Sequence, residues 1–465
     1  MNFCDITVEQ LAAEVRTGKR SAATLMQETL ERINEHNPKV NALVAMVDDE
    51  RLLAQAHAID RRVARGEDPG PLAGIPTAVK DLENVAGLRT TFGSRLFADS
   101  PPASRDSIVV QRLRTAGAVI VGKTNTPEFG CKGTTDNLLF GATRNPWNLD
   151  YACGGSSGGS AAALAAGLVP LATGSDGGGS IRIPASACGF SGFKPSTGRI
   201  PSGDEAAPTG RTLSVRGVMA RTLRDTVLAL NVIKGDAETD IFALPDDHVD
   251  WLTAYSDGAR PDRVIWSPTL GFAKLDDSVR QVCEAAIERL REAGLTVVER
   301  DRIITEDPLP YWWTLWTAGL ACTLGKRVDT ESAPRIDPAL RHMVEVGSTV
   351  TGVEYARALD ACHVFNYQLE QAFVTAPIIL APTCAGRVPR LGKGGLVNGR
   401  EMENWVQLTF GLNLSRNPAA SVYAGLNADG LPVGLQIIGR QRRDLETLIA
   451  AGAIERILGG PGRPA

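Results

Sequence analysis

Apolar residues recur along the chain with two different periods, and this alternation predicts helices and strands. Apolar residues three and four positions apart predict amphipathic helices, whereas short apolar runs bounded by turn residues predict strands. The predicted helices cover residues 8–17, 22–36, 48–65, 105–116, 158–167, 222–234, 276–293, 352–374 and 443–457. The predicted strands lie near residues 40–47, 75–79, 118–121, 168–173, 263–267, 295–299, 377–381 and 432–438. The pattern favours an α/β fold with a mixed sheet.

Composition agrees with an ordinary globular protein. A chain of 465 residues can bury a large core, and 43% hydrophobic with 22% charged residues is typical of this class. No internal repeat is evident. The stretch 201–210 contains Pro and Gly and is interpreted as the border of a functional site rather than as a linker. We therefore predict a single domain over residues 1–465.

Charge, cysteines and the N-terminal residues narrow the partners and the compartment. The formal net charge of −4 provides no basic field for nucleic acid or for an acidic membrane surface. The eight cysteines include no C-x-x-C pair, so they indicate neither a metal site nor a disulfide framework. The first residues lack the regions of a signal peptide, and the longest apolar stretch, 161–172, is too short to span a bilayer. The prediction is a cytoplasmic protein that binds a small molecule without a cofactor, and a homodimer stays open.

The candidate chemistry lies in a Gly-rich segment and in one upstream lysine. Ser156 lies in GGSSGG at 154–159 and Ser180 in SDGGGSIR at 175–182, while Lys80 ends the apolar run GIPTAVK. These residues supply a Ser nucleophile, a second Ser, a Lys base and backbone donors for an oxyanion, which permit hydrolysis without histidine. A flexible linker fits poorly, because the helix-forming run AAALAA interrupts the glycines.

Two other kinds of site share parts of this pattern. A phosphate-binding loop requires G-x-x-x-x-G-K-[ST], but Ala161 follows Ser160 where the lysine would be needed. The sequence GGSSG matches the G-x-S-x-G elbow of α/β-hydrolases, in which Ser156 would be the nucleophile of an esterase. That elbow requires a downstream acid and histidine. None of the three downstream histidines lies in a loop that looks built for catalysis: His248, His342 and His363.

In order and spacing, these segments resemble the amidase signature family. Three further segments match it: GKTNTPEFG, FGATRNPW and GFKP. Ser156 and Ser180 are separated by 24 positions, which is the family's interval between its bridging and nucleophilic serines. The resemblance runs from about residue 5 to about 455 and implies a mixed sheet of many strands surrounded by helices. It also implies a signature core at about 70–200 and a variable substrate-pocket region at about 200–400.

The resemblance implies a role for each matching residue. Ser180 resembles the nucleophile that forms an acyl-enzyme, Ser156 the bridging serine preceded by a cis peptide, and Lys80 the base. A lysine accepts a proton only when neutral, so the site must lower the pKa of Lys80 from its usual value near 10.4. The expected oxyanion donors are the backbone N–H groups of Gly177, Gly178, Gly179 and Ser180. Residues expected to support the site structurally are Ser157, Asp176 and Arg182.

Three positions leave alternatives or depart from the family. Asp176 and Arg182 would otherwise be interpreted as a plain surface salt bridge. Position 177, usually threonine in the family, is glycine here, which leaves the backbone donor and removes a hydroxyl. Cys153 lies where the family often has proline or a small residue, and we interpret it as a packed hydrophobic residue rather than a nucleophile.

For the substrate, the resemblance implies a small linear amide, with carbamates and hydrazides also known among substrates of the family. Gly130, Cys131 and Lys132 are expected to border the pocket. Tyr311, Trp312, Trp313 and Trp316 are candidates for an aromatic wall, but the spacing of the three tryptophans equally fits a buried helical face. The wall favours an aryl or apolar acyl amide.

Two further functions stay open at this point. An amidotransferase A-type subunit would act with a partner chain and a tRNA substrate, although Gly177 and the divergent 300–400 region disfavour it. A non-catalytic binding protein is disfavoured because Lys80, Ser156 and Ser180 are all present.

Overall fold

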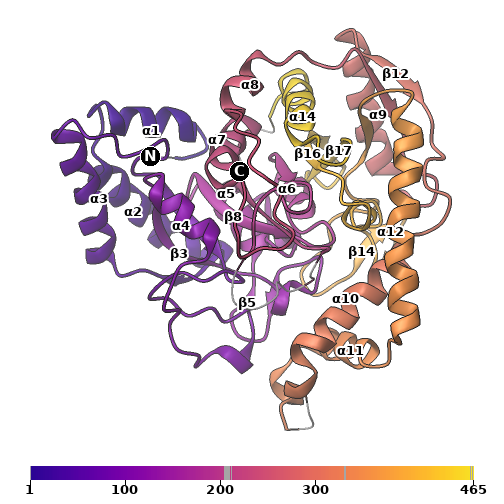
Figure 1. The fold of residues 1–465 in the computed structure, drawn as a ribbon, viewed down its shortest axis with the longest axis horizontal. Coiled ribbons are helices and arrows are strands. Elements are labelled where there is room, and N and C mark those ends of the chain that lie inside the picture. The colour runs from indigo at the N-terminus through magenta and orange to yellow at the C-terminus, as the bar shows by residue number, and fades with distance from the viewer. Residues whose placement is uncertain are drawn as a thin grey trace.

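The computed structural model describes residues 2–203, 210, 212–328, 331–460, 462 and 464, and within them eleven strands form one sheet (Figure 1). In pairing order, the strands are β1 (Leu43–Met46), β3 (Val119–Thr124), β2 (Pro76–Lys80), β8 (Leu171–Asp176), β10 (Val215–Ala220), β9 (Gly192–Lys194), β16 (Ala419–Leu426), β17 (Pro432–Ile438), β13 (Ile379–Pro382), β11 (Arg263–Trp266) and β12 (Thr296–Glu299). Strand β2 pairs in parallel with β3 and β8, and β11 pairs in parallel with β12 and β13. The other pairs are antiparallel, so the sheet is mixed as predicted.

Helices surround this sheet, which confirms the predicted fold class (Figure 1). They are α1 (Val8–Arg16), α2 (Ala22–Val40), α3 (Asp49–Ala64), α4 (Ile108–Thr115), α5 (Gly158–Ala165), α6 (Arg182–Cys188), α7 (Leu223–Ile233), α8 (Trp251–Asp257), α9 (Asp277–Glu292), α10 (Leu309–Leu324), α11 (Pro338–Gly347), α12 (Gly352–Phe373), α13 (Gly411–Leu414) and α14 (Asp444–Leu458). Three small hairpins add β4 (Asp136–Asn137) with β5 (Gly141–Ala142), β6 (Arg144–Asn145) with β7 (Asn148–Ala152), and β14 (Gly395–Val397) with β15 (Arg400–Met402).

Helix α5 lies in the interior because its residues are small. All eight of its residues are buried, and apart from a single leucine the sequence GGSAAALA consists of Gly, Ser and Ala. A Cβ atom added at Gly159 would lie 2.3 Å from the backbone nitrogen of Asn125, which follows β3. Glycine therefore allows the first turn of α5 to approach the ends of β2 and β3 closely. This approach brings the residues just before α5, Ser156 and Ser157, next to Lys80.

Each of the predicted helices and strands is present, with ends displaced by a few residues. Several elements were not predicted. Helix α10 is apolar around most of its circumference, so it shows no 3.6-residue alternation of apolar and polar positions. Strands β10 and β16 have small residues in place of the β-branched runs that mark strands. The other helices and strands missed are α6, α8, α11, α13 and β9 and the short hairpin strands β4, β5, β6, β7, β14 and β15. The single domain over 1–465 and its division at about 70–200 and 200–400 stay predictions, and residues 204–209 of the proposed border segment lie outside the described residues.

Candidate active site

Lys80, the last residue of β2, is fully buried beside three serine hydroxyls. Its Nζ atom lies 2.8 Å from Ser156 Oγ, 2.8 Å from Ser157 Oγ and 3.0 Å from Ser175 Oγ. The Ser157 hydroxyl donates its own proton to the backbone oxygen of Ser175, at 3.2 Å. Within the described residues, the Ser156 hydroxyl has no hydrogen-bond partner besides Lys80. When Lys80 is neutral, the Ser156 hydroxyl is therefore placed to donate to the lysine lone pair.

The surroundings of Lys80 favour the neutral amine. Burial lowers the pKa of Lys80 to about 7, with the charge of Arg216 acting in the same direction, while Asp176 and Glu83 oppose the shift. Within the part of the chain that is described, no carboxylate forms an ion pair with the Lys80 ammonium. A lysine of this kind can take up and return a proton near neutral pH.

Ser156 follows a cis peptide bond to Gly155, as the resemblance implied. Its side chain is buried, and a Cβ atom at Gly130 would lie 3.1 Å from Ser156 Oγ, so the glycine leaves room for the hydroxyl. The next residue, Ser157, is the N-cap of α5, and its backbone N–H donates to the backbone oxygen of Ser180 at 3.1 Å. This bond ties the two serine segments together. No hydrogen bond joins the hydroxyls of Ser156 and Ser180 in the described structure, and such bonds commonly tighten only when substrate binds.

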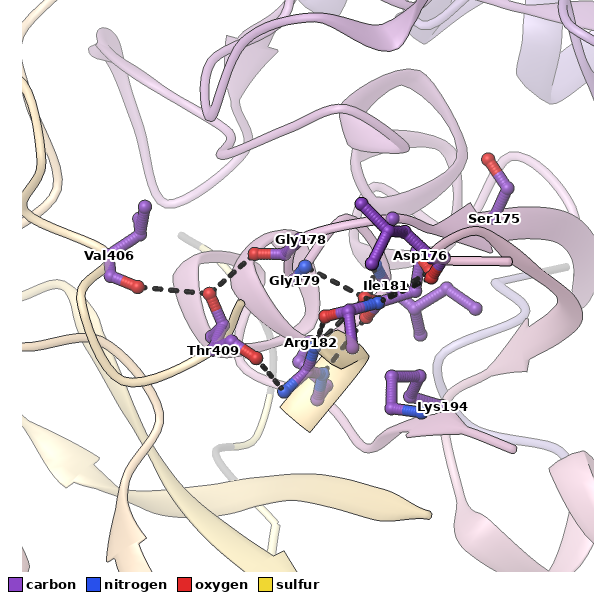
Figure 2. Close-up of polar contacts among 12 residues, drawn as sticks. Ser175, Asp176, Gly178, Gly179, Ile181, Arg182, Lys194, Val406 and Thr409 are labelled. Carbon is purple, nitrogen blue, oxygen red and sulfur yellow. Dashed lines mark hydrogen bonds and ion pairs between the residues drawn. The ribbon is translucent and has the colours of Figure 1, made fainter. Parts of the chain in front are cut away.

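The loop between β8 and α6 is held by a buried ion pair (Figure 2). Arg182 Nη2 lies 2.9 Å from Asp176 Oδ1, and both side chains are fully buried. Although burial opposes ionisation, the Arg182 guanidinium holds the pKa of Asp176 well below its usual range. The alternative of a surface salt bridge is therefore wrong for Asp176 and Arg182, since neither side chain reaches solvent.

Three residues far along the chain complete this support. Arg182 also donates to Gln436 Oε1 at 2.7 Å, to Asn413 Oδ1 at 2.8 Å and to the backbone oxygen of Thr409 at 2.9 Å. The Thr409 hydroxyl donates to the backbone oxygen of Gly178 at 2.6 Å (Figure 2). The loop that carries Ser180 is thus fixed from both sides by groups with satisfied hydrogen bonds.

Gly179 differs from the predicted set of oxyanion donors. Its N–H donates to Asp176 Oδ1 at 2.7 Å (Figure 2), so it is directed at a carboxylate and not toward a substrate. The prediction is corrected accordingly, because one N–H group aimed at an anion 2.7 Å away has no proton to share with an oxyanion. The other predicted donors, at Gly177, Gly178 and Ser180, keep that role as a proposal.

A cavity of about 1020 Å³ opens in front of Ser180. Gly130, Cys131 and Lys132 line it, and that this cavity is the substrate pocket stays a prediction. The Lys132 ammonium lies 2.6 Å from Asp136 and 2.7 Å from Asp337. Although burial acts against the charge, these carboxylates raise the pKa of Lys132 above its usual value. Lys132 therefore stays charged in the wall of the cavity, where the two carboxylates balance its charge.

The tryptophans of α10 form part of the same wall and also pack into the core. Trp312, Trp313 and Trp316 line the cavity, whereas Tyr311 does not and its ring instead contacts Phe365. Trp316 is nevertheless only 5% exposed, and its ring stacks on Trp312 with centroids 5.2 Å apart. Trp312 Nε1 donates to the backbone oxygen of Gly177 at 2.7 Å. The same face of α10 therefore lines the cavity and packs into the core, so the two predicted roles of the tryptophans do not exclude each other.

Sequence reasoning did not identify Ser175, Thr409, Asn413, Gln436 or Arg216 as parts of the site. Ser175 lay inside a matched segment, but nothing in its spacing indicated a bond to Lys80. Asn413 and Gln436 lie more than 200 positions from Arg182 and carried no local signal. The interpretation of Cys153 agrees with its full burial, which raises the pKa of the thiol to about 12.

Comparisons with known proteins give the family of the chain. The model of the amidase family matches residues 24–448. An acylamidase of Rhodococcus erythropolis is 35% identical over 462 residues, which cover 97% of this chain and 95% of that protein. The A subunit of the glutamyl-tRNA(Gln) amidotransferase of Roseiflexus castenholzii is 36% identical over 478 residues, covering 97% of this chain and 96% of that protein. The crystal structure of a bacterial aryl acylamidase of the amidase signature family matches with a TM-score of 0.90 and 30% identity, over 97% of this chain and 96% of that one. No helix within the described residues is long and apolar enough to cross a membrane.

Proposed function

The chain belongs to the amidase signature family of C–N bond hydrolases, and from this premise we propose that it hydrolyses an aryl or apolar acyl amide through an acyl-enzyme on Ser180. The observation that carries the proposal is that Ser180 and the tryptophans of α10 line one cavity. Cavities of several hundred Å³ with mostly apolar walls and a few polar groups are typical of small-molecule sites.

In the proposed acylation, Ser180 Oγ attacks the carbonyl carbon of the amide while its proton passes to Ser156 Oγ. The Ser156 proton moves to neutral Lys80 over the 2.8 Å hydrogen bond. The oxyanion accepts from the N–H groups of Gly177, Gly178 and Ser180, and each such donor is typically worth about 3 kcal/mol in the transition state.

Collapse of this intermediate requires a proton on the leaving nitrogen. Ser156 donates it, and Lys80 returns its proton to Ser156, so that the amine leaves neutral and Lys80 is again a base. The acyl group stays on Ser180 until water hydrolyses the ester. No histidine takes part in these steps.

Covalent labelling tests the nucleophile. A sulfonyl fluoride should sulfonylate Ser180 with loss of fluoride, because the donors around Ser180 favour attack there. Intact mass and peptide mapping locate the label. A label on Ser156 would support the esterase alternative with a nucleophile elbow and would contradict the proposal.

Substrate preference is tested on the purified chain with matched anilides and aliphatic amides. Trp313 is the most suitable position for a substitution, because it lines the cavity and its indole has no hydrogen bond to the Ser180 loop in the described structure. We expect Trp313→Ala to lower kcat/KM for an anilide by about tenfold, the loss expected for roughly 1.4 kcal/mol of aromatic contact. Equal loss on acetamide would argue against an aromatic binding wall.

A second candidate function rests on the 36% identity to an amidotransferase component, which is no lower than the identity to the acylamidase. A component of that kind would need a partner chain. Hydrolysis of anilides by the purified chain alone would favour the amidase. A chain that is inactive on every amide, but still labelled at Ser180, would favour the amidotransferase.

A further inference from the structure

We propose that a second, small cavity beside Ser180 holds the water that hydrolyses the acyl-enzyme, and that Arg216 positions this water. The inference rests on the proposed function, since it requires an acyl group on Ser180.

The two cavities share three lining residues, and the rest of their walls differ. Gly130, Ser180 and Trp316 border both. Ser156, Ser175, Ser214 and Arg216 border only the small cavity. A substrate acyl group in the large cavity therefore approaches Ser180 from one side, and the small cavity gives access from another.

The volume of the small cavity limits which molecule can occupy it. It offers about 20 Å³ to the centres of water molecules, and about 10–15 Å³ of such space holds one water. A carboxylate or an amide, with three or more heavy atoms, requires several times more. Water is therefore the favoured occupant, and a substrate group is not.

The walls offer the polar partners that a held water needs. Buried waters typically make about three hydrogen bonds, and besides Ser180 four side chains with hydroxyl or guanidinium groups line this cavity. Arg216 lies on β10 directly opposite Ser175 of β8 in the antiparallel register. Within the described residues, its guanidinium forms no ion pair or hydrogen bond, which leaves its N–H groups to donate to a water oxygen.

The same cavity contains the proton acceptor. The water oxygen forms a bond to the acyl carbon while one water proton passes to Ser156 Oγ, and the Ser156 proton passes to Lys80. When the intermediate collapses, the C–O bond to Ser180 breaks, and the proton returns through Ser156 to Ser180 Oγ. The products are the free carboxylic acid and the original enzyme, so the atoms and protons balance.

The charge of Arg216 also favours the return of the proton. Burial lowers the pKa of Lys80, and Arg216 acts in the same direction. A protonated Lys80 beside a second cation gives up its proton readily. This effect should contribute to both half-reactions, whereas holding the water affects only deacylation.

The test separates the two half-reactions with a p-nitrophenyl ester. Stopped-flow measurement gives the burst of p-nitrophenol, which reports acylation, and the slower steady rate, which reports deacylation. In Arg216→Met we expect deacylation to fall by at least about tenfold, as for a displaced reacting group, while the burst rate falls much less. Arg216→Lys should recover part of the deacylation rate.

Product partition supplies a second readout. With hydroxylamine as a competing acceptor, wild type and variant should both form hydroxamate, and Arg216→Met should raise the ratio of hydroxamate to acid. A structural role would not change this ratio. Ser214→Val, which fills the small cavity without removing a charge, should raise it as well and covers the case in which Arg216→Met fails to fold. The matched control is Arg221→Met, because Arg221 follows β10 but bonds to the backbone oxygen of Gly462.

Equal slowing of acylation and deacylation, or an unchanged product ratio in Arg216→Met and Ser214→Val, would overturn the proposal. Failure of the proposed function looks different. In that case wild type itself would show no burst and no label on Ser180.

Discussion

Lowering the pH should switch off hydrolysis by protonating Lys80. Burial, assisted by Arg216, lowers the pKa of Lys80 to about 7. About half of the molecules then carry a neutral lysine at pH 7, against roughly 0.04% for a lysine with an ordinary pKa near 10.4. Two pH units below 7, only about 1% is neutral, so kcat/KM at pH 5 should be about 100-fold below its plateau above pH 8.

The assay is kcat/KM for one anilide between pH 5 and pH 9 at constant ionic strength, with circular dichroism at each pH to confirm folding. The group whose protonation lowers the activity must be identified, because Glu455 also titrates in this pH range. Burial raises the pKa of Glu455 to about 7, but its carboxylate bonds to Ser191 and to the N–H of Leu223, and it lines neither cavity. Glu455→Gln should therefore keep the acid limb unchanged.

Lys80→Met removes the base while preserving the apolar stem. We expect a loss of at least about 100-fold in kcat. The stability of the protein should also depend on the protonation of Lys80. The pKa of Lys80 is lower in the folded state than in the unfolded state, so between about pH 7 and 10.4 the unfolded state binds more protons. The free energy of unfolding of wild type should therefore gain a rising contribution with pH in that window, and Lys80→Met should lack it.

Two results would contradict the role of Lys80 as the base. A flat profile between pH 5 and 7 would mean that the amine is already neutral or is not the base. Substantial activity in Lys80→Met would remove the lysine from the mechanism altogether.

Three further predictions concern residues around Lys80. Ser156→Ala breaks the path between Ser180 and Lys80, so it should impair an amide more than an activated ester, whose leaving group needs little protonation; equal loss would remove Ser156 as the acid. Asp176→Asn leaves Arg182 buried without its counter-ion and should lower the free energy of unfolding by about 3–5 kcal/mol in urea titration, whereas a change near zero would mean that Gln436 and Asn413 suffice. Gly177→Thr introduces the residue that is usual in the family, but a Cβ atom at 177 would lie 2.7 Å from the Trp316 ring. The substitution should therefore lower both the melting temperature and kcat. The double variant Gly177→Thr with Trp316→Ala should recover part of both.

The sequence carried enough information for the fold class and for the contact between Lys80 and Ser156. Each of those residues lies in a contiguous segment whose composition and order matched a family. Lys80 ends strand β2, and Ser156 lies just before helix α5, which packs against β2. The amphipathic helices were predictable because their apolar positions repeat with a regular period. Small-residue strands such as β10, and the apolar helix α10, have no such period and were missed.

The geometry of hydrogen bonds was less accessible to sequence reasoning. The pattern SDGGGS predicts a turn with several free N–H groups, and nothing local shows that Asp176 takes the N–H of Gly179. The partners of Arg182 at Asn413 and Gln436 come together only because β17 and the segment before β16 close over α6. Such contacts are set by tertiary packing between segments that are distant in sequence.

Gly177 shows how far a single departure from a family pattern can be interpreted. From the sequence, the loss of threonine removed only a hydroxyl, and its cause was invisible. In the structure, a Cβ atom at 177 would lie 2.7 Å from the Trp316 ring, and one at Gly178 would lie 2.7 Å from the Trp312 ring. Two indoles of α10 therefore occupy the space that side chains at these positions would need, and Trp312 bonds to the backbone oxygen of Gly177 as well. The two glycines and the two tryptophans therefore depend on each other: only residues without a side chain at 177 and 178 allow the indoles of α10 to pack against the loop that carries the nucleophile.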